Sequence, residues 1–254
     1  MNDFVTRILR YDSLPSTNTE AARLAQQQAP EGLTVVAGEQ TAGRGRLERR
    51  WVSPAGAGLY VSIILRPQSA HALWSVIPLM AALAVHDALA EACMLKVDIK
   101  WPNDILVGER KLCGILAETL ETSAGRAVIL GIGINLKTEA FPAELRKVAT
   151  SIEDATGTAP DSESVLQPLL LALARRYAVL QTVGGAAEII RDWTKHSTYA
   201  QDKRVSVTSG DEEFSGITRG LESDGALRVE TDAGQIKVVH AGDVASIREA
   251  SVCR

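Results

Sequence analysis

The pattern of the sequence changes near residue 199, and this change limits the architecture that the chain can adopt. Before it, apolar strand-like runs alternate with helical segments. After it, short alternating runs are separated by Ser-Gly-Asp, Ser-Asp-Gly and Asp-Ala-Gly turns, a pattern typical of a small antiparallel β module. A chain of 254 residues can bury a sizeable core. We therefore expect an α+β protein with a large domain at residues 1–200 and a small β domain at residues 201–254.

Individual segments of the large domain predict its elements. The β-branched residues of GLYVSIILRP, at 58–67, predict a buried strand, and the Ala- and Leu-rich stretch at 79–92 predicts a helix. Residues 96–121 predict a strand, a break at Pro102 and a hairpin that turns at 108–110. The other expected elements are helices at 16–30 and 162–183, the second with a capping box from Ser164 and Gln167, and strands at 33–40 and 126–136.

Charge and cysteine content exclude several classes of protein. Lys and Arg number 27 against 31 Asp and Glu, a formal net charge of −4, which argues against a protein that coats nucleic acid or an anionic membrane. Three cysteines without C-x-x-C spacing disfavour a disulfide framework and a zinc site. The first residues carry no signal-peptide pattern, and the most apolar segment, 73–93, is interrupted by polar residues and Pro78. We expect a cytoplasmic protein with no membrane partner.

The stretch EQTAGRGRLERRW, residues 39–51, concentrates positive charge in this acidic chain. Gly43 and Gly45 permit backbone angles, and a close approach to a ligand, that side chains would block. Arginine binds carboxylate or phosphate through a planar fork, so Arg44 and Arg46 can close over an anionic ligand. The alternative is a solvated surface loop.

A second candidate is the hairpin that carries KWPND and RKLCGILAE. If residues 108–110 form a three-residue turn, Val107 faces Lys111 and Asn103 faces Ile115, which places Asn103 and Lys111 on one face. A lysine among apolar strand residues indicates a site. The alternative is an edge strand that its lysine protects from aggregation.

The third candidate, LGIGIN, places Gly131 and Gly133 on one face of an expected strand. Glycine in a strand often marks a bulge or the close approach of a ligand. A helix packed across the sheet explains the same glycines. Neither this segment nor GRGRLE supplies the G-x-G-x-x-G of a dinucleotide-binding fold.

Other polar residues carry weaker signals. Lys100 and Asp104 flank the break at Pro102 and, on sequence alone, are expected to be ordinary polar residues. The histidines lie far apart, and each is expected to be structural or exposed: His71, His86, His196 and His240.

Taken together, these segments resemble the biotin protein ligases, also called biotin–[acetyl-CoA-carboxylase] ligases. The motifs stand in the family's order and spacing and cover essentially the whole chain. They are STN at 16–18, QTAGRGR at 40–46, Trp51, KWPND at 100–104, KLCGILAE at 111–118 and GIGIN at 131–135. The resemblance implies a mixed-sheet catalytic domain with helices on the sheet, plus a small C-terminal SH3-like β-barrel.

The resemblance also implies a two-step protein modification. The biotin carboxylate attacks the α-phosphate of ATP to give biotinyl-5′-AMP and pyrophosphate. A lysine of the biotin carboxyl carrier domain of a carboxylase then attacks the mixed anhydride. ATP and biotin are the expected substrates, and Mg²⁺, with no ligands assigned, is expected to neutralise the departing pyrophosphate.

Matching positions assign the roles. The expected catalytic residues are Lys111, Arg44, Arg46 and Asp104, the last to orient the carrier lysine. Biotin contacts are expected from Ser16, Thr17, Asn18, Gln40, Arg44, Gly45, Arg46, Lys111, Gly114, Gly131 and Gly133. Nucleotide contacts are expected from Arg46, Arg49, Trp51, Asn103, Lys111 and Asn135.

The chain departs from the family pattern at two points. Glu48 stands where the loop usually has glycine, so its conformation and closing are expected to differ. The STN motif begins at residue 16, which leaves no room for the N-terminal DNA-binding domain of bifunctional members. We therefore expect a ligase only, with no DNA partner, and leave open whether it is a monomer or a homodimer.

Two other functions compete with this one. A lipoate–protein ligase shares the catalytic fold but is expected to carry R-R-x-x-G-G-G, which this sequence lacks. A non-catalytic biotin or nucleotide sensor can lose the lysine of KLCGILAE, whereas Lys111 is present.

Overall fold

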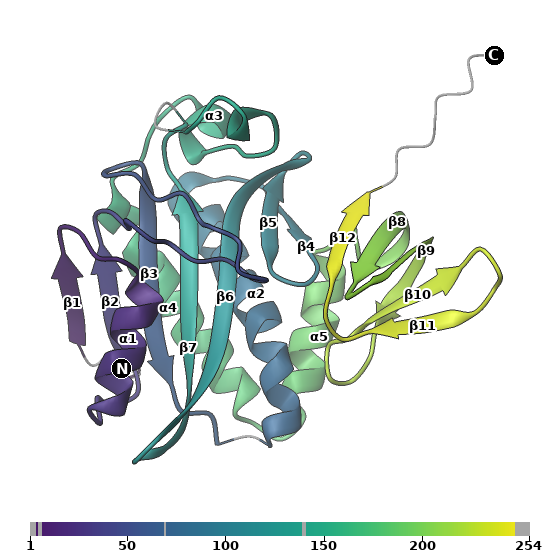
Figure 1. Ribbon diagram of the computed structural model, residues 1–254, viewed down its shortest axis with the longest axis horizontal. Coiled ribbons are helices and arrows are strands. Elements are labelled where there is room, and N and C mark those ends of the chain that lie inside the picture. Colours follow the sequence, from purple (N-terminus) through teal and green to yellow (C-terminus); the bar gives the residue numbers. More distant parts are fainter. Residues whose placement is uncertain (1–3, 5–6, 69, 139–140, 247–254) are drawn as a thin grey trace.

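The computed structural model describes residue 4 and residues 7–68, 70–138 and 141–246. A mixed seven-stranded sheet in the order β1-β2-β3-β7-β6-β5-β4 forms its larger part (Figure 1). Strands β1 and β2 are parallel, and the other neighbouring pairs are antiparallel. The strands are β1 (Arg7–Tyr11), β2 (Leu33–Ala37), β3 (Gly58–Leu65), β4 (Asp98–Lys100), β5 (Asp104–Val107), β6 (Arg110–Thr122) and β7 (Gly125–Asn135).

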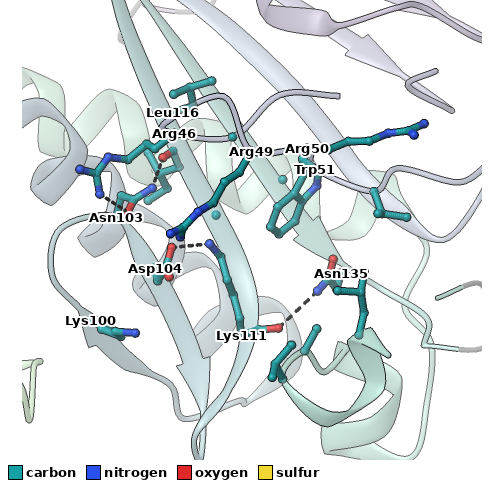
Figure 2. A pocket seen from close by; sticks show the side chains of 18 of the residues that line it. Arg46, Arg49, Arg50, Trp51, Lys100, Asn103, Asp104, Lys111, Leu116 and Asn135 are labelled. Atoms are coloured by element: carbon teal, nitrogen blue, oxygen red, sulfur yellow. Dashed lines mark hydrogen bonds and ion pairs between the residues drawn. The ribbon is translucent and has the colours of Figure 1, made fainter. Parts of the chain in front are cut away.

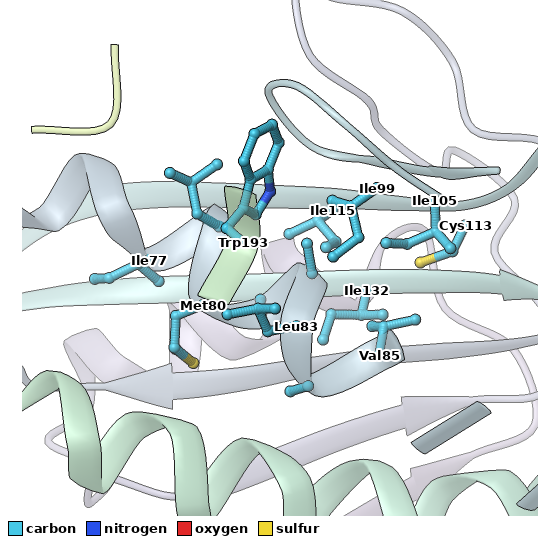
Figure 3. Packing of buried hydrophobic residues seen from close by; sticks show 14 of the residues in the cluster. Ile77, Met80, Leu83, Val85, Ile99, Ile105, Cys113, Ile115, Ile132 and Trp193 are labelled. Carbon is cyan, nitrogen blue, oxygen red and sulfur yellow. The ribbon is translucent and has the colours of Figure 1, made fainter. Parts of the chain in front are cut away.

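Helices cover both faces of this sheet, and the prediction of helices on the sheet is confirmed. On one face α1 (Thr17–Gln26) buries Ala21 and Ala25 against β2, β3 and β7. On the other face, α2 (Ile77–Cys93), α4 (Ser162–Leu180) and α5 (Gly185–Lys195) enclose the main core. Figure 3 shows part of this core, with Leu83 of α2, Ile132 of β7 and Trp193 of α5 in one cluster. Three short helices complete the larger part: α3 (Ile152–Thr156), η1 (His71–Val76) and η2 (Leu145–Lys147).

The apolar composition of α2 follows from its place in the core. The segment Leu73–Cys93 is long and apolar enough to cross a membrane, with a mean hydropathy of 1.6. However, Met80, Leu83 and Val85 are completely buried, and α2 packs against α4, α5 and the sheet. The helix therefore meets protein on most sides, which accounts for its apolar character.

A second, five-stranded antiparallel sheet follows, in the order β11-β10-β9-β8-β12. Its strands are β8 (Gln201–Ser209), β9 (Glu212–Leu221), β10 (Leu227–Thr231), β11 (Ile236–Val239) and β12 (Asp243–Ser246). The Trp101 indole donates a hydrogen bond of 3.0 Å to the Gly225 carbonyl and joins this sheet to the larger part. The two sheets confirm the predicted α+β class. The domain boundary at residue 200 stays a prediction.

The predicted register of the β5–β6 hairpin is wrong at its turn. Val107 pairs with Arg110, one residue earlier than predicted, because the turn contains two residues. A bulge at Leu112 then shifts the register, and beyond it the amide of Ile115 donates to the Asn103 carbonyl at 3.0 Å. The predicted pairing of Asn103 with Ile115 is therefore confirmed.

The predicted capping box of α4 is also wrong. Asp161 is the N-cap, and its carboxylate accepts from the Glu163 amide at 3.1 Å. Ser164 lies inside the first turn, where its hydroxyl donates to the Asp161 carbonyl at 2.6 Å. Gln167 instead bonds the Glu163 side chain at 2.6 Å. An aspartate three residues earlier satisfies the free amides of the first turn, so Ser164 is not needed there.

This assignment predicts unequal effects of two alanine substitutions. Asp161→Ala should lower the stability of the protein by about 1 kcal/mol, because an amide of the first turn loses its acceptor. Ser164→Ala should cost less than half as much. Thermal melts followed by the helix signal in circular dichroism measure the loss of stability in both variants. Equal losses of stability in the two variants would instead support the capping box of Ser164 and Gln167.

Candidate active site

A cavity of about 810 Å³ lies between the loop at 39–51, strands β6 and β7, and strand β12. Every residue to which the sequence assigned a role lines it: Ser16, Thr17, Asn18, Gln40, Arg44, Gly45, Arg46, Arg49, Trp51, Asn103, Asp104, Lys111, Gly114, Gly131, Gly133 and Asn135. Lys100, expected to be an ordinary polar residue, also lines it. Asp243 and Tyr199, which the sequence did not single out, do so too.

An ion pair between Lys111 and Asp104 joins the two strands of the β5–β6 hairpin. Lys111 Nζ lies 2.5 Å from Asp104 Oδ1, and Figure 2 shows the two side chains pointing toward one another. The backbone of Lys111 is fixed from the other side, where its amide donates to the Val148 carbonyl at 2.8 Å. The ammonium also lies 5.4 Å from the centre of the Trp51 ring, within cation–π range. Lys111 is thus a half-buried cation held at the cavity wall by a carboxylate.

Three glycines on neighbouring strands form the floor of the cavity. Gly114 of β6 pairs directly with Gly133 of β7, and Gly131 lies two residues away on the same face. A Cβ on Gly131 would lie 2.1 Å from Asn18 Oδ1, and one on Gly133 would lie 2.5 Å from Trp51 Nε1. The sequence left open a crossing helix or a ligand as the reason for these glycines. The structure shows α1 over Gly131 and the Trp51 indole over Gly133 and Gly114, both beside the cavity.

The start of α1 presents buried polar groups to this floor. Ser16 caps the helix, and Gln40 Oε1 accepts from the Thr17 amide at 2.9 Å and from its hydroxyl at 3.1 Å. Ser62 Oγ, completely buried, lies 2.7 Å from Thr17 Oγ1 and 2.6 Å from Asn18 Oδ1. Ser62 was missed by the sequence analysis. The signal was its place as the polar residue of an otherwise apolar buried strand.

The arginine loop is tied down by partners from three parts of the chain. Arg44 Nη2 lies 2.7 Å from Glu118 Oε2 of β6. Arg46 donates to Asn103 Oδ1 at 3.2 Å and to a carbonyl of the C-terminal part at 3.3 Å. Arg49 pairs with Asp243 at the start of β12. Burial lowers the pKa of Arg46, although the guanidinium keeps its charge at neutral pH.

Gly43 serves the folding of the loop itself. A Cβ on Gly43 would lie 2.4 Å from the Trp51 carbonyl, so this glycine admits the returning strand of the loop rather than a ligand. Leu47 and Glu48 at the tip have φ values of 52° and 59°. Both are in the left-handed region, which costs about 1 kcal/mol or more for a residue with a Cβ. Glu48 therefore adopts an angle that suits the glycine expected there. A changed conformation and closing of the loop stay a prediction.

Two asparagines that line the cavity are held by backbone groups. Asn103 Nδ2 donates to the Ile115 carbonyl at 2.6 Å, and Asn135 Nδ2 donates to the Thr150 carbonyl at 2.9 Å.

Burial changes the pKa of two further groups in this region. It lowers the pKa of Lys100, whose ammonium lies 5.9 Å from the centre of the Tyr199 ring. Burial raises the pKa of the Cys113 thiol, so this cysteine is a packing residue and not a nucleophile.

Comparisons with known proteins agree with this geometry. Residues 11–135 match the model of the biotin/lipoate A/B protein ligase family, and residues 202–245 match that of the biotin protein ligase C terminal domain. The bifunctional ligase/repressor BirA of Bacillus subtilis is 39% identical over 241 residues, which are 93% of this chain and 73% of that protein. The chain belongs to the biotin protein ligase family.

Other ligases cover the chain more evenly. A biotin–[acetyl-CoA-carboxylase] ligase of Paracoccus denitrificans is 38% identical over 237 residues, 90% of this chain and 96% of that protein. The biotin protein ligase of Aquifex aeolicus, solved in complex with biotin and ATP, superposes with a TM-score of 0.82 and 30% identity. That match covers 96% of this chain and 99% of the Aquifex chain. The family predicted from the motifs is confirmed.

The left-handed tip of the ligase loop predicts an effect of Glu48→Gly. Glycine adopts the φ of 59° without a Cβ clash, so the closed loop should be populated more and cut more slowly by trypsin at its arginines. Glu48→Ala, which removes the charge but keeps a Cβ, is the matched control and should be cut at the wild-type rate. Equal protection in both variants would assign the effect to the carboxylate and not to the backbone.

Proposed function

We infer that this protein is an ATP-dependent biotin protein ligase that forms biotinyl-5′-AMP and transfers biotin to a protein lysine. The observation that carries this function is the continuous cavity of about 810 Å³. The polar groups of α1, Lys111 and the arginines of the loop all line this one cavity. Two substrates that must meet, one with a carboxylate and one with phosphates, need this combination in one cavity.

In the first step, a carboxylate oxygen of biotin forms a bond to the α-phosphorus of ATP, and pyrophosphate leaves. Both reacting groups are anionic, so they repel until cations lie between them. Lys111 is placed for this task because its charge already faces a carboxylate, that of Asp104, at 2.5 Å. When biotin and the α-phosphate take Lys111, Asp104 is released from the pair.

In the second step, an acceptor lysine attacks the carbonyl of the mixed anhydride, and AMP leaves. We propose that the released Asp104 orients this amine and accepts its proton, since it is the carboxylate beside Lys111 at the cavity wall. The loop at 39–51 covers the anhydride until the acceptor arrives and so limits its hydrolysis. The proposed acceptor is the biotin carboxyl carrier domain of a carboxylase.

The cavity supports a division of its residues between the two substrates. Groups around α1 and the glycine floor suit the biotin head: Ser16, Thr17, Asn18, Gln40, Gly114, Gly131 and Gly133. Groups near the C-terminal sheet and residues 141–150 suit the nucleotide: Arg46, Arg49, Trp51, Asn103 and Asn135. We propose that Lys111, Arg44, Gly45 and Arg46 contact the groups at which the two substrates meet.

We propose that Mg²⁺ enters with the phosphates of ATP. Across the residues that the structure describes, no group of three His, Cys, Asp or Glu side chains is arranged to hold a metal. The carboxylates of Asp104 and Asp243 line the cavity near its cations, and magnesium commonly combines one or two such groups with substrate phosphates and water. When bound, the ion neutralises charge on the departing pyrophosphate.

We also propose that the protein acts in the cytoplasm.

Substitution of Lys111 tests the first step. Lys111→Ala should lower biotin-dependent ATP–pyrophosphate exchange by roughly 100-fold or more, as for loss of one preorganised group that stabilises charge. Lys96→Ala, an exposed lysine outside the cavity, should exchange at the wild-type rate. Wild-type exchange by Lys111→Ala would remove Lys111 from the mechanism. Exchange that requires lipoate instead of biotin would favour the related lipoate ligase, and no exchange with either acid would favour a sensor.

The glycine floor predicts separate effects on the two substrates. Gly131→Ala should raise the KM for biotin and spare that for ATP, because the new methyl collides with Asn18 at 2.1 Å. Gly133→Ala displaces the Trp51 indole and should raise the KM for ATP more. Steady-state kinetics on both variants provide the comparison. Equal effects on both substrates would contradict the proposed division of the cavity.

A further inference from the structure

Glu118, which carries no role in the reaction described above, holds two residues of the site at once. Its Oε2 atom accepts a hydrogen bond of 2.7 Å from Asn18 Nδ2 and one of 2.7 Å from Arg44 Nη2. Asn18 lies on α1, Arg44 on the loop and Glu118 on β6, so a single oxygen joins three segments far apart in the sequence. Glu118 is not among the residues that line the cavity.

The contact with Glu118 fixes the orientation of the Asn18 amide. Asn18 Oδ1 lies 2.6 Å from the hydroxyl of Ser62, whereas Nδ2 faces Glu118 at 2.7 Å and the Leu116 carbonyl at 3.4 Å. Both acceptors on the Nδ2 side lack a proton to donate, so a flipped amide would place its oxygen against them. The carboxylate thus decides which polar atom of Asn18 faces which neighbour.

The same carboxylate supplies the charge partner of Arg44. The side chain of Arg44 is 45% exposed and that of Glu118 is 35% exposed. Water therefore partly screens the ion pair, and the loop can still move away from Glu118. The contact nevertheless sets where the arginine rests when the loop is closed. Because one oxygen serves both donors, a displacement of Arg44 changes the electrostatic environment of Asn18, and the reverse holds equally.

We propose that Glu118 is a positioning residue that couples the biotin subsite at Asn18 to closure of the loop through Arg44. The proposal rests on the function inferred above and adds a residue outside the cavity to it. Loss of the carboxylate frees the amide and the arginine together. Biotin is then bound less well and the closed loop releases biotinyl-5′-AMP sooner, whereas the nucleotide half of the cavity is unaffected.

Kinetics on Glu118→Ala and Glu118→Gln provide the test. Glu118→Ala should raise the KM for biotin by roughly 10-fold, the range for a partly exposed charged hydrogen bond, and should speed release of the adenylate by a similar factor. The KM for ATP and the melting temperature should stay near the wild-type values. Glu118→Gln retains one acceptor oxygen without the charge, so it should keep much of the biotin affinity but release the adenylate faster. Glu121→Ala, an exposed carboxylate on the same strand, is the control and should match the wild type.

The outcomes separate this proposal from the general function. Wild-type protein without biotin-dependent exchange would overturn the proposed function itself. If the wild type exchanges and Glu118→Ala matches it in biotin KM and adenylate release, the coupling role is wrong. Parallel changes in both KM values together with a lowered melting temperature would also overturn it, because they indicate a structural role in β6.

Discussion

The site depends on the absence of side chains at one place in the sheet. Gly114 and Gly133 face one another across β6 and β7, and Gly131 continues the same face. Each missing Cβ leaves room that another group fills: Asn18 stands over Gly131, and Trp51 stands over the glycine pair. The sheet therefore provides a floor on which Asn18 and Trp51 lie beside the cavity that Lys111 also lines.

Ion pairs explain how an acidic chain accommodates several cations in one cavity. Lys111, Arg44 and Arg49 each rest on a carboxylate, from Asp104, Glu118 and Asp243 respectively. In the proposed function, anionic substrate groups take the place of these carboxylates. Since Asp243 lies on β12, the C-terminal sheet helps to hold the loop in place.

Local patterns predicted the parts of the site that lie close in sequence, and contacts between distant segments escaped prediction. The Gly-Arg loop and the glycine pair on β7 follow from spacing and residue type. Asn103 and Lys111 do line one cavity, but the register from which their shared face was predicted is wrong at Lys111. Glu118 and Asp243 could not be predicted in this way, because their arginine partners in the loop lie 74 and 194 positions away in the sequence. The same limit applies to the fold: β1 becomes a strand through its pairing with β2, and the cap of α4 was misplaced by three residues among several capping candidates.

The most direct test of the account is to ask what the protein holds after reaction without an acceptor. Purified protein incubated with biotin and Mg-ATP is passed through a desalting column, and the bound small molecules are identified by mass spectrometry after denaturation. We predict that the wild type retains biotinyl-5′-AMP, because the loop closes over it, and that a parallel sample of Lys111→Ala contains none. Recovery of unreacted biotin and ATP from the wild type, or of an adenylate only when lipoate replaces biotin, would contradict it.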